Sequence, residues 1–193
     1  DCSVVFAVEE LGVRETQFRV ETGAGNLMCS WRRGQDGEFL VKVEMGTPVV
    51  SNTSIEFGID EITTLSVHPA NMGNPHGVIF LEHEMSREWM ESVAHKVERL
   101  SVFPEGVNVG FAQVQANKLQ LTVHERGCGF TEACGTGACA AVAVAIDQGH
   151  VPHGHEVSVE LPGGTLLVQW DEEGRPIWME GPSVRVMTGN TFL

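Results

Sequence analysis

The chain has 193 residues, 42% of them hydrophobic and 20% charged, which is typical of a globular protein long enough to bury a core. A formal net charge of −14 argues against a nucleic-acid-binding protein, because contacts to phosphates need clustered Lys and Arg and the largest cluster is Arg32-Arg33. No apolar run is long enough for a membrane-spanning helix, and residues 1–3 have neither the basic nor the apolar part of a secretory signal.

The five cysteines are an odd number in a chain without a recognisable secretory signal, which predicts free thiols in a reducing, cytoplasmic compartment rather than a disulfide framework. They are Cys2, Cys29, Cys128, Cys134 and Cys139. The spacing of the last three, Cys-x5-Cys-x4-Cys, does not match the close cysteine pairs of structural zinc sites. We therefore expect no bound metal and at least one thiol that is free for chemistry.

The first expected element is a helix at residues 3–11, which ends at Gly12, a common residue just past a helix. Short segments of alternating apolar and polar residues follow, and each predicts a β-strand of about five residues bounded by turn formers. These segments are residues 18–22, 26–31, 38–46, 63–67, 77–82, 107–115, 118–123, 156–161, 164–170, 176–180 and 184–189. Turns such as Ala116-Asn117 and Pro162-Gly163-Gly164 favour antiparallel hairpins between them.

Two further helices interrupt the strands. Residues 86–100 start with a serine suited to capping and carry apolar residues three or four apart, which indicates a helix with one face on the core. Residues 137–148, which end at Gly149, are apolar on nearly every side, as expected for a buried helix. The predicted fold class is therefore α+β, with a mostly antiparallel curled sheet or barrel wrapped around a buried central helix. One boundary is indicated, near Met45-Gly46-Thr47-Pro48, where a strand ends in Gly and Pro.

Cys134 lies at the entrance to the predicted buried helix, directly before Gly135-Thr136-Gly137. We expect the backbone N–H groups of residues 135–138 to lack partners in the first helical turn, and the helix dipole adds partial positive charge there. Such a position favours an anion, which could be the Cys134 thiolate, with its pKa lowered, or a substrate carboxylate. With both present, the thiolate could remove an α-proton while the amides stabilise the developing negative charge. An ordinary buried cysteine before a glycine-rich turn fits the spacing equally well.

Several motifs in this sequence resemble the diaminopimelate epimerase family, in the expected order and over nearly the whole chain. They are Met72-Gly73-Asn74-Pro75-His76; Phe103-Pro104-Glu105 with Asn108; Glu125-Arg126-Gly127 with Thr131 and the run Ala133-Cys134-Gly135-Thr136-Gly137-Ala138-Cys139-Ala140-Ala141; and Leu161-Pro162-Gly163-Gly164. The resemblance implies the fold of that family and an isomerase that uses no pyridoxal phosphate, other cofactor or metal. The implied reaction converts LL-2,6-diaminopimelate to its meso form, a step of lysine and peptidoglycan precursor biosynthesis.

The resemblance also implies a role for each matching residue. In the family two cysteines face each other across the substrate α-carbon, and Cys134 matches one of them. Glu125 and His76 match positions that support the catalytic thiols or hold the substrate. The positions that bind the distal, non-reacting end of the substrate are matched by Asn74, Asn108 and Arg126, and those whose amides hold the reacting carboxylate by Gly135 and Thr136.

One family motif is not found in this sequence: the earlier Cys-Gly-Asn-Gly segment that carries the other catalytic cysteine. Residues 2–7 resemble the helix that follows that segment, and the sequence starts without Met, so we expect it to begin after the first catalytic segment. Residues 1–44 are then the remainder of an N-terminal epimerase domain, 45–180 the C-terminal domain, and 181–193 a final strand that returns to the first domain. With one catalytic thiol, this chain alone is expected to be inactive.

Two other functions remain open from the sequence: a related proline racemase-like or phenazine-type isomerase, and a non-catalytic binding remnant. The expected partners are a small-molecule amino-acid substrate, the missing N-terminal half of the same protein and a second copy in a homodimer, with no nucleic acid or membrane. A further cluster, His150, His153 and His155, lies in a polar turn and is interpreted as three solvated histidines rather than a metal site.

Overall fold

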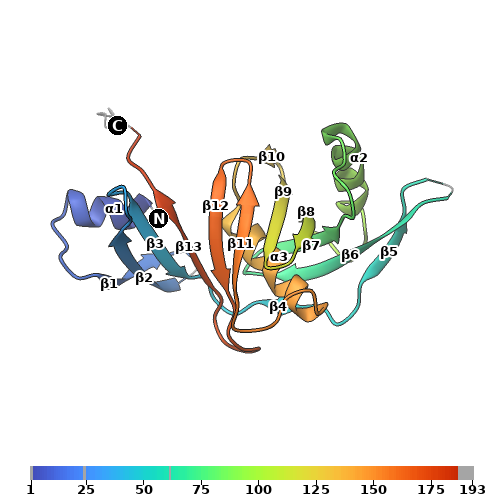
Figure 1. Ribbon diagram of the computed structural model, residues 1–193. Coiled ribbons are helices and arrows are strands. Elements are labelled where there is room, and N and C mark those ends of the chain that lie inside the picture. Colours follow the sequence, from blue (N-terminus) through green and yellow to red (C-terminus); the bar gives the residue numbers. More distant parts are fainter. Residues whose placement is uncertain (1, 24, 61, 187–193) are drawn as a thin grey trace. The chain divides into compact units, whose positions relative to one another are not determined.

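The computed structural model describes residues 2–23, 25–60 and 62–186 (Figure 1). The chain divides into two compact units, which we call unit 1 (Asp1–Glu44 with Glu180–Leu193) and unit 2 (Met45–Met179). The described residues contain no helix that is both long and apolar enough to cross a membrane. The predicted fold class, mainly antiparallel strands with few helices, is confirmed.

Unit 1 is a small antiparallel sheet with one helix. Its elements are α1 (Cys2–Glu9), β1 (Gln17–Thr22), β2 (Gly25–Arg33), β3 (Phe39–Glu44) and most of β13 (Trp178–Ser183). Strand β2 pairs with β1 and with β3 in antiparallel register, and β13 comes next to β3 in the strand order. The helix predicted at residues 3–11 is therefore confirmed, with Gly12 beyond its end at a φ of 70°.

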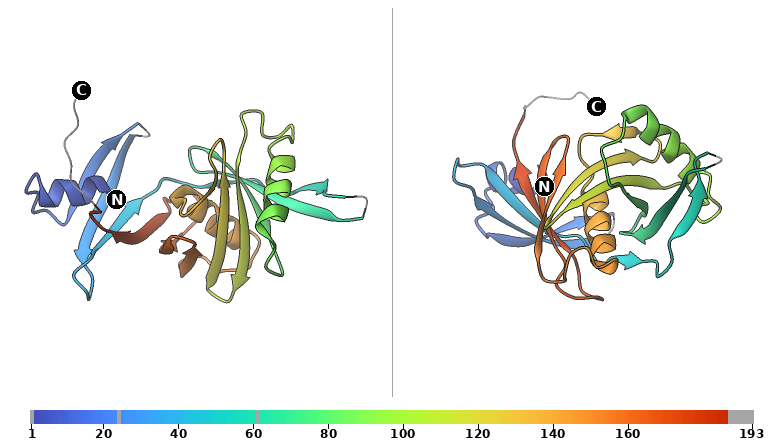
Figure 2. Two further views of the ribbon diagram at one scale, coloured as in Figure 1. Left: turned by 90° about the horizontal axis from the view of Figure 1, so that it is seen from above. Right: turned by 45° about the vertical axis from the view of Figure 1, so that its right-hand side comes forward.

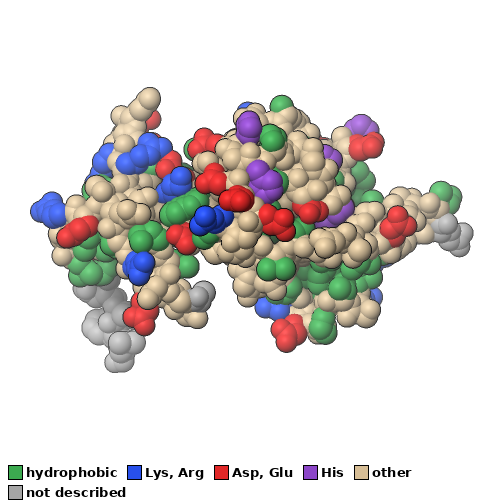
Figure 3. Space-filling model, turned by 90° about the horizontal axis from the view of Figure 1, so that it is seen from below, with side chains coloured by type: hydrophobic (Ala, Val, Ile, Leu, Met, Phe, Trp, Pro, Cys, Tyr) green, Lys and Arg blue, Asp and Glu red, His purple; other side chains and the backbone are tan. Residues whose placement is uncertain are grey.

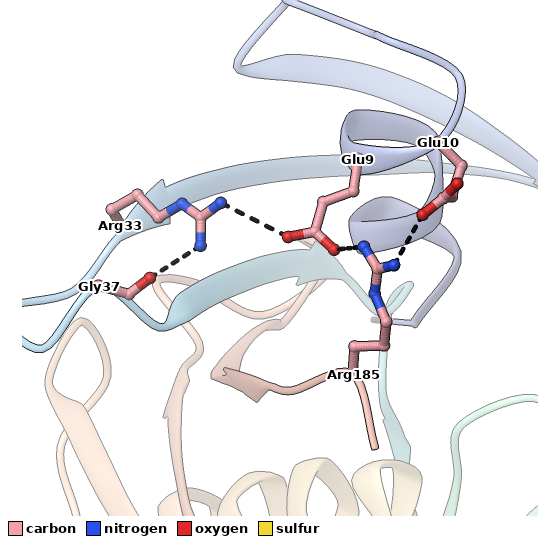
Figure 4. Close-up of polar contacts among 5 residues, drawn as sticks. All are labelled: Glu9, Glu10, Arg33, Gly37 and Arg185. Atoms are coloured by element: carbon pink, nitrogen blue, oxygen red, sulfur yellow. Dashed lines mark hydrogen bonds and ion pairs between the residues drawn. The ribbon is translucent and has the colours of Figure 1, made fainter. Parts of the chain in front are cut away.

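Ion pairs connect the elements of unit 1 (Figure 4). Arg185 binds Glu9 through one guanidinium nitrogen and Glu10 through another, at 2.8 Å for Glu10. Arg33 Nη2 lies 3.7 Å from Glu9 Oε1, and Arg33 Nη1 donates to the Gly37 carbonyl at 2.8 Å. These pairs are at the surface, where each contributes little to stability, but they fix the chain after β13 beside α1.

The strand predicted at residues 184–189 is wrong for residues 184–186, which form no strand, and the rest of it lies outside the described residues. Strand β13 ends at Ser183. The alternating pattern of this segment misleads because Val184 and Val186 are both exposed, at 68% and 92% of their surface. No buried face exists for them to cover, so the alternation has no structural consequence here.

Unit 2 contains a longer sheet. Its strands are β4 (Val49–Val50), β5 (Ile55–Gly58), β6 (Thr64–Asn71), β7 (Pro75–Phe80), β8 (Asn108–Gln115), β9 (Lys118–Glu125), β10 (Gly129–Thr131), β11 (Glu156–Leu161) and β12 (Gly164–Gln169). Their order is β12-β11-β9-β8-β7-β6-β4, while β5 pairs with β6 and β10 with β9. The short strands β4, β5 and β10 were not predicted.

Two neighbouring pairs in this sheet are parallel, which corrects the expectation that hairpins are the default connection. Strand β7 pairs with β8, and β9 with β11, both in parallel register. Parallel neighbours need a crossover connection, and the helices α2 (Arg87–Val97) and α3 (Gly135–Asp147) lie in those two connections. The remaining neighbours with a described register in unit 2 are antiparallel, including β8–β9 through Ala116 at a φ of 54°.

Helix α3 is the buried element that the sequence predicts. Every residue from Gly137 to Ile146 is buried, and the helix contacts β4, β6, β7, β8, β9 and β12. Figure 2 shows the strands of unit 2 curving around it. Its alanines keep the helix thin, so strands on several sides can approach its backbone, and Gly149 ends it at a φ of 75°.

Helix α2 covers a second cluster of apolar side chains. The Ser86 hydroxyl accepts a hydrogen bond from the Trp89 N–H at 3.2 Å and so caps the helix as expected. Val93 and Val97 are almost fully buried against β7 and β8 residues such as Ile79 and Phe111. Burial of each valine stabilises the fold by about 1.5–3 kcal/mol relative to exposure.

Candidate active site

Cys134 is the N-cap residue of α3, which begins two residues earlier than predicted. Its backbone is extended, with φ −134° and ψ 104°, and its carbonyl accepts the first helical hydrogen bond from the Ala138 N–H at 2.9 Å. The N–H groups of Gly135, Thr136 and Gly137 precede this bond and have no helical acceptor. The expectation that the N–H groups of residues 135–138 all lack partners is therefore wrong for Ala138, whose N–H makes a helical hydrogen bond.

The Asn-Pro-His motif is a tight hairpin between β6 and β7. Gly73, at a φ of 94°, makes the turn, and its N–H donates to Asn71 Oδ1 at 2.7 Å. Asn71 lies opposite Pro75 in the register, so residues 72–74 form the loop. A left-handed φ of this kind suits glycine, which explains Gly73 in the motif. The hairpin presents Asn74 toward the start of α3, and His76 contacts Asn74.

A chain of polar contacts joins this hairpin to Cys134. His76 Nε2 lies 3.0 Å from Asn74 Oδ1, Asn74 Nδ2 donates to Thr136 Oγ1 at 3.3 Å, and Thr136 Oγ1 lies 3.6 Å from Cys134 Sγ. The donor of each hydrogen bond in this series can be assigned. Since Thr136 accepts from the Asn74 amide, its own hydroxyl proton is available for the sulfur.

His76 is 2% exposed, and burial lowers its pKa to about 4. It is therefore neutral at neutral pH, and one ring nitrogen keeps its proton. With that proton on Nε2, His76 donates to Asn74 Oδ1 and holds the Asn74 amide in the orientation that offers Nδ2 to Thr136. The structure thus connects His76 to Cys134 through Asn74 and Thr136.

The predicted lowering of the Cys134 pKa is wrong: the pKa of this thiol is raised. Cys134 is 7% exposed, and burial, the largest cause, disfavours the charged thiolate. The Thr136 hydroxyl and the Gly137 N–H act in the opposite direction, although the Cys134 side chain makes no capping hydrogen bond of good geometry. The Glu125 carboxylate raises the pKa further, so Cys134 is a thiol at neutral pH and can donate a proton there.

Glu125 is the last residue of β9 and accepts a short hydrogen bond of 2.6 Å from the Thr131 hydroxyl of β10. The two strands are joined by a tight turn in which Gly127 and Gly129 both have a φ of 77°. Because Glu125 raises the pKa of the Cys134 thiol, these two predicted site residues lie close enough to interact. Thr131 was given no separate role by the sequence, although it stands in the same motif.

The Asn108 side chain is hydrogen-bonded to the Arg126 backbone. Asn108, 6% exposed, accepts from the Arg126 N–H at 3.0 Å and donates to the Pro75 carbonyl at 3.2 Å. The Arg126 guanidinium is exposed and donates to the Glu105 carbonyl at 2.7 Å, which leaves its other donors for a ligand. Gly106 lies beneath this side chain, where a Cβ would come within 2.8 Å of Arg126 Cδ.

The Leu-Pro-Gly-Gly motif forms the turn between β11 and β12 and supports the segment before Cys134. The Gly163 N–H donates to the Glu132 carbonyl at 2.7 Å. A Cβ on Gly163 would lie 3.0 Å from that same oxygen, so a larger residue would have to push the Glu132 backbone away. The motif therefore fixes the backbone two residues before the thiol.

The other candidates from the sequence lie apart from this cluster. Cys139 is fully buried inside α3, as expected for a small core residue, and Cys128 is exposed. The rings of His150 and His153 contact different aromatic side chains, Phe80 and Trp170. A cavity of about 310 Å³ between α2 and β8, β9 and β11 is lined by none of the predicted site residues.

Comparison with known proteins decides the family. The family model described as diaminopimelate epimerase matches residues 69–191, more than half of the chain and including the motifs described above. The chain belongs to the diaminopimelate epimerase family. A diaminopimelate epimerase from Psychrobacter sp. (strain PRwf-1) is 38% identical to it, over 90% of this chain and 62% of that relative. The chain thus spans less than two thirds of the length of this diaminopimelate epimerase.

Solved structures share the fold at lower identity. A probable proline racemase from Agrobacterium radiobacter K84 is 17% identical with a TM-score of 0.71, over 95% of this chain and 66% of that one. A hydroxyproline epimerase from Agrobacterium vitis is 18% identical with the same TM-score, over 93% and 61%. A Bacillus anthracis phenazine biosynthesis protein of the PhzF family is 14% identical with a TM-score of 0.66, over 91% and 68%. At these identities the likeness shows that the chain and these neighbours share a fold.

Proposed function

We propose that this chain carries one half of the catalytic centre of a cofactor-independent epimerase that converts LL-2,6-diaminopimelate to the meso form. The product serves lysine and peptidoglycan precursor synthesis, and the proposed compartment is the cytoplasm. The observation that supports this proposal is the position of Cys134, a thiol at the start of buried α3, beside three N–H groups without helical acceptors. Membership of the diaminopimelate epimerase family supports the substrate class.

The proposed chemistry is a proton transfer at the substrate α-carbon. The reacting carboxylate binds the amides of Gly135 and Thr136, where the helix dipole favours negative charge. One thiolate takes the α-proton and becomes a thiol, and the amides stabilise the enediolate-like charge that forms. A second thiol on the opposite face then gives its proton to the carbon and becomes a thiolate. Because its pKa is raised, Cys134 enters this cycle as the proton donor at neutral pH.

The distal end of the substrate is proposed to be held by Asn74, Asn108, Arg126 and Glu125. Arg126 has donors beyond the one used by Glu105 and can bind a carboxylate through two of them. Asn108 and Pro75 position the Arg126 backbone, so this subsite is prepared before the ligand binds. Amino acids that lack the distal group would leave the remaining Arg126 donors without this partner and would bind less well.

A two-thiol cycle needs a partner for Cys134. Within unit 2, Cys139 is sealed in the core and Cys128 lies on an exposed turn, so neither is suited to face Cys134 across a substrate. We propose that a second catalytic segment of the same protein, of the Cys-Gly-Asn-Gly type, supplies the other thiol, and that the 193-residue chain alone does not turn over. A homodimer is the assembly proposed for the active protein.

The test measures meso-diaminopimelate formation and α-deuterium uptake in deuterated water. The 193-residue chain is compared with a version extended at its N-terminus by the Cys-Gly-Asn-Gly segment. We expect turnover by the extended protein, loss of turnover in its Cys134→Ser variant, and no product from the short chain. Turnover by the short chain contradicts the two-thiol assignment. An extended protein that inverts proline instead of diaminopimelate contradicts the substrate, and an inert extended protein indicates a binding remnant.

A further inference from the structure

A cluster of histidine and glutamate side chains lies between α2 and β9, outside the catalytic residues. Glu91 and His95 on α2 and Glu98, the residue that caps its C-terminal end, are spaced four and three residues apart, which places them on one face of the helix. His124 belongs to β9. Glu91, His95 and His124 each offer one ligand atom, and these atoms lie within 4.8 Å of one another.

His124 is the unusual member of this cluster. It is 4% exposed, and its Nδ1 atom is buried without a hydrogen-bond partner. Glu98 Oε1 lies 3.5 Å from that nitrogen, close enough for an ion pair but outside hydrogen-bond geometry. The other ring nitrogen, Nε2, lies 4.0 Å from the place that a Cβ on Gly129 would occupy. A buried nitrogen without a hydrogen-bond partner is unfavourable, so the position of His124 Nδ1 on the side facing α2 needs an explanation.

Packing alone does not explain an imidazole at this position. The His124 ring contacts Phe130 and His95 edge-on, at centroid distances of 5.1 and 5.3 Å. An apolar ring would make the same contacts without burying a polar atom. The nitrogen therefore indicates a ligand that the exposed side chains of Glu91 and His95 could also reach.

We propose that Glu91, His95 and His124 bind a divalent transition-metal ion of the Zn²⁺ class. Two imidazoles and a carboxylate are ligands that zinc accepts in a tetrahedral set, with water in the remaining position. Glu98 Oε2 lies 3.2 Å from His95 Nδ1, so Glu98 can accept a hydrogen bond there and leave the other ring nitrogen of His95 for the metal.

This site is separate from the proposed chemistry. His124 and Glu125 are neighbours in β9, and successive side chains of a strand point to opposite faces of the sheet. The metal therefore lies on the face covered by α2, whereas Glu125 acts on Cys134. An ion there would connect α2 to the end of β9 and stabilise the strand that carries Glu125 and Arg126.

The charge of the chain favours a cation. Its formal net charge is −14, and acidic side chains are scattered over the face drawn in Figure 3, with Lys and Arg between them. Histidine side chains also reach this surface. The rival location is the turn with His150, His153 and His155. Since His150 and His153 contact different aromatic rings, that turn serves as the control.

The experiment is a zinc titration of the full 193-residue chain after treatment with a chelator. Calorimetry and a competing chromophoric chelator give the stoichiometry and the Kd, and thermal unfolding gives the stabilisation by bound metal. We expect one site per chain, with Kd raised at least about tenfold in Glu91→Gln and in His95→Gln, both exposed positions on α2. The double variant His153→Gln/His155→Gln should bind as the unsubstituted chain does.

Two further measurements separate the site from other zinc ligands. His124→Phe keeps the ring contacts and removes the nitrogen, so it should fold without metal and gain no thermal stability from zinc. X-ray absorption of the zinc-loaded chain should show nitrogen and oxygen neighbours with imidazole scattering. The proposal is overturned by a chain that does not bind zinc, by unchanged binding in His95→Gln, by binding lost in the His153→Gln/His155→Gln control, or by sulfur in the zinc shell.

Discussion

The Thr136 hydroxyl lies between the Cys134 sulfur and the Asn74 amide, 3.6 Å from Sγ and 3.3 Å from Nδ2. Asn74 is in turn held by His76 of β7. His76 therefore helps to orient the Thr136 hydroxyl toward the Cys134 thiol at the start of α3. The thiol is subject to opposing influences. Burial and Glu125 favour the protonated form, while Thr136 and the Gly137 N–H favour the thiolate.

Thr136→Val should make Cys134 less reactive. The substitution keeps the shape of the side chain and removes the hydroxyl that stabilises the thiolate, so the pKa of Cys134 rises further. Loss of a hydrogen bond worth about 1 kcal/mol corresponds to alkylation about fivefold slower at neutral pH. Iodoacetamide labelling, read for the Cys134 peptide by mass spectrometry, measures the rate across pH. Thr136→Ser is the matched control and should retain the original rate; equal slowing in both variants contradicts the role of the hydroxyl.

Glu125→Gln should have the opposite effect on the same measurement. The Glu125 carboxylate raises the pKa of Cys134, so its neutral replacement lets the thiolate form at lower pH and speeds alkylation at neutral pH. Glu132→Gln is the control, because Glu132 is closer to Cys134 in sequence than Glu125 but is exposed and is not among the groups that act on the thiol. An alkylation profile that stays in place or moves to higher pH in Glu125→Gln would show that the carboxylate does not act on Cys134.

Local sequence patterns predicted the elements that depend on nearby residues. The alanine-rich run between Gly137 and Gly149 indicated a buried helix, and Ser86 indicated the start of α2; both follow from the residues of a single segment. The motif-based resemblance identified the family. In contrast, the parallel pairs β7–β8 and β9–β11 depend on where the chain returns after each helix, which no local pattern specifies.

The parts of the site that the sequence did not predict are those that depend on the folded surroundings. Asn74 and Thr136 are 62 residues apart, so their hydrogen bond exists only once β7 lies beside α3. The direction of the Cys134 pKa was wrong for a similar reason: a helix terminus is visible in the sequence, but the burial of the sulfur is not. The convergence of Glu91 and His95 with His124 across two elements was likewise invisible.

Gly163→Ala should lower the stability of unit 2 and disturb the segment before Cys134. The new Cβ would lie 3.0 Å from the Glu132 carbonyl oxygen and 3.3 Å from its carbon, and these are backbone atoms that cannot rotate away. We expect a loss of about 1–3 kcal/mol in the free energy of unfolding, measured by urea denaturation. Gly23→Ala is the control, since no atom lies within 4 Å of its added Cβ. Equal stability of the two variants would contradict the close approach of the Leu-Pro-Gly-Gly turn.

His76 should make the stability of the chain depend on pH in mildly acidic solution. Its pKa is lowered from 6.5 to about 4 by burial, so between these values the unfolded chain binds a proton that the folded chain does not. Stability is therefore fully present above about pH 6.5 and is lost as the pH falls toward 4, by up to about 3 kcal/mol. Below the folded pKa the contribution of His76 becomes constant, because both states are then protonated.

The variant His76→Gln separates this effect from other titrating groups. Glutamine does not titrate, so the free energy of unfolding should fall less steeply below about pH 6.5 than in the unsubstituted chain. The largest difference in slope is the one that uptake of a single proton on unfolding produces. His68, whose pKa is also lowered by burial, remains in both proteins and cancels in the comparison. Urea denaturation at a series of pH values gives both slopes. Parallel slopes would mean that His76 can take up a proton without leaving its site, and the fixed orientation of Asn74 would then have to come from another residue.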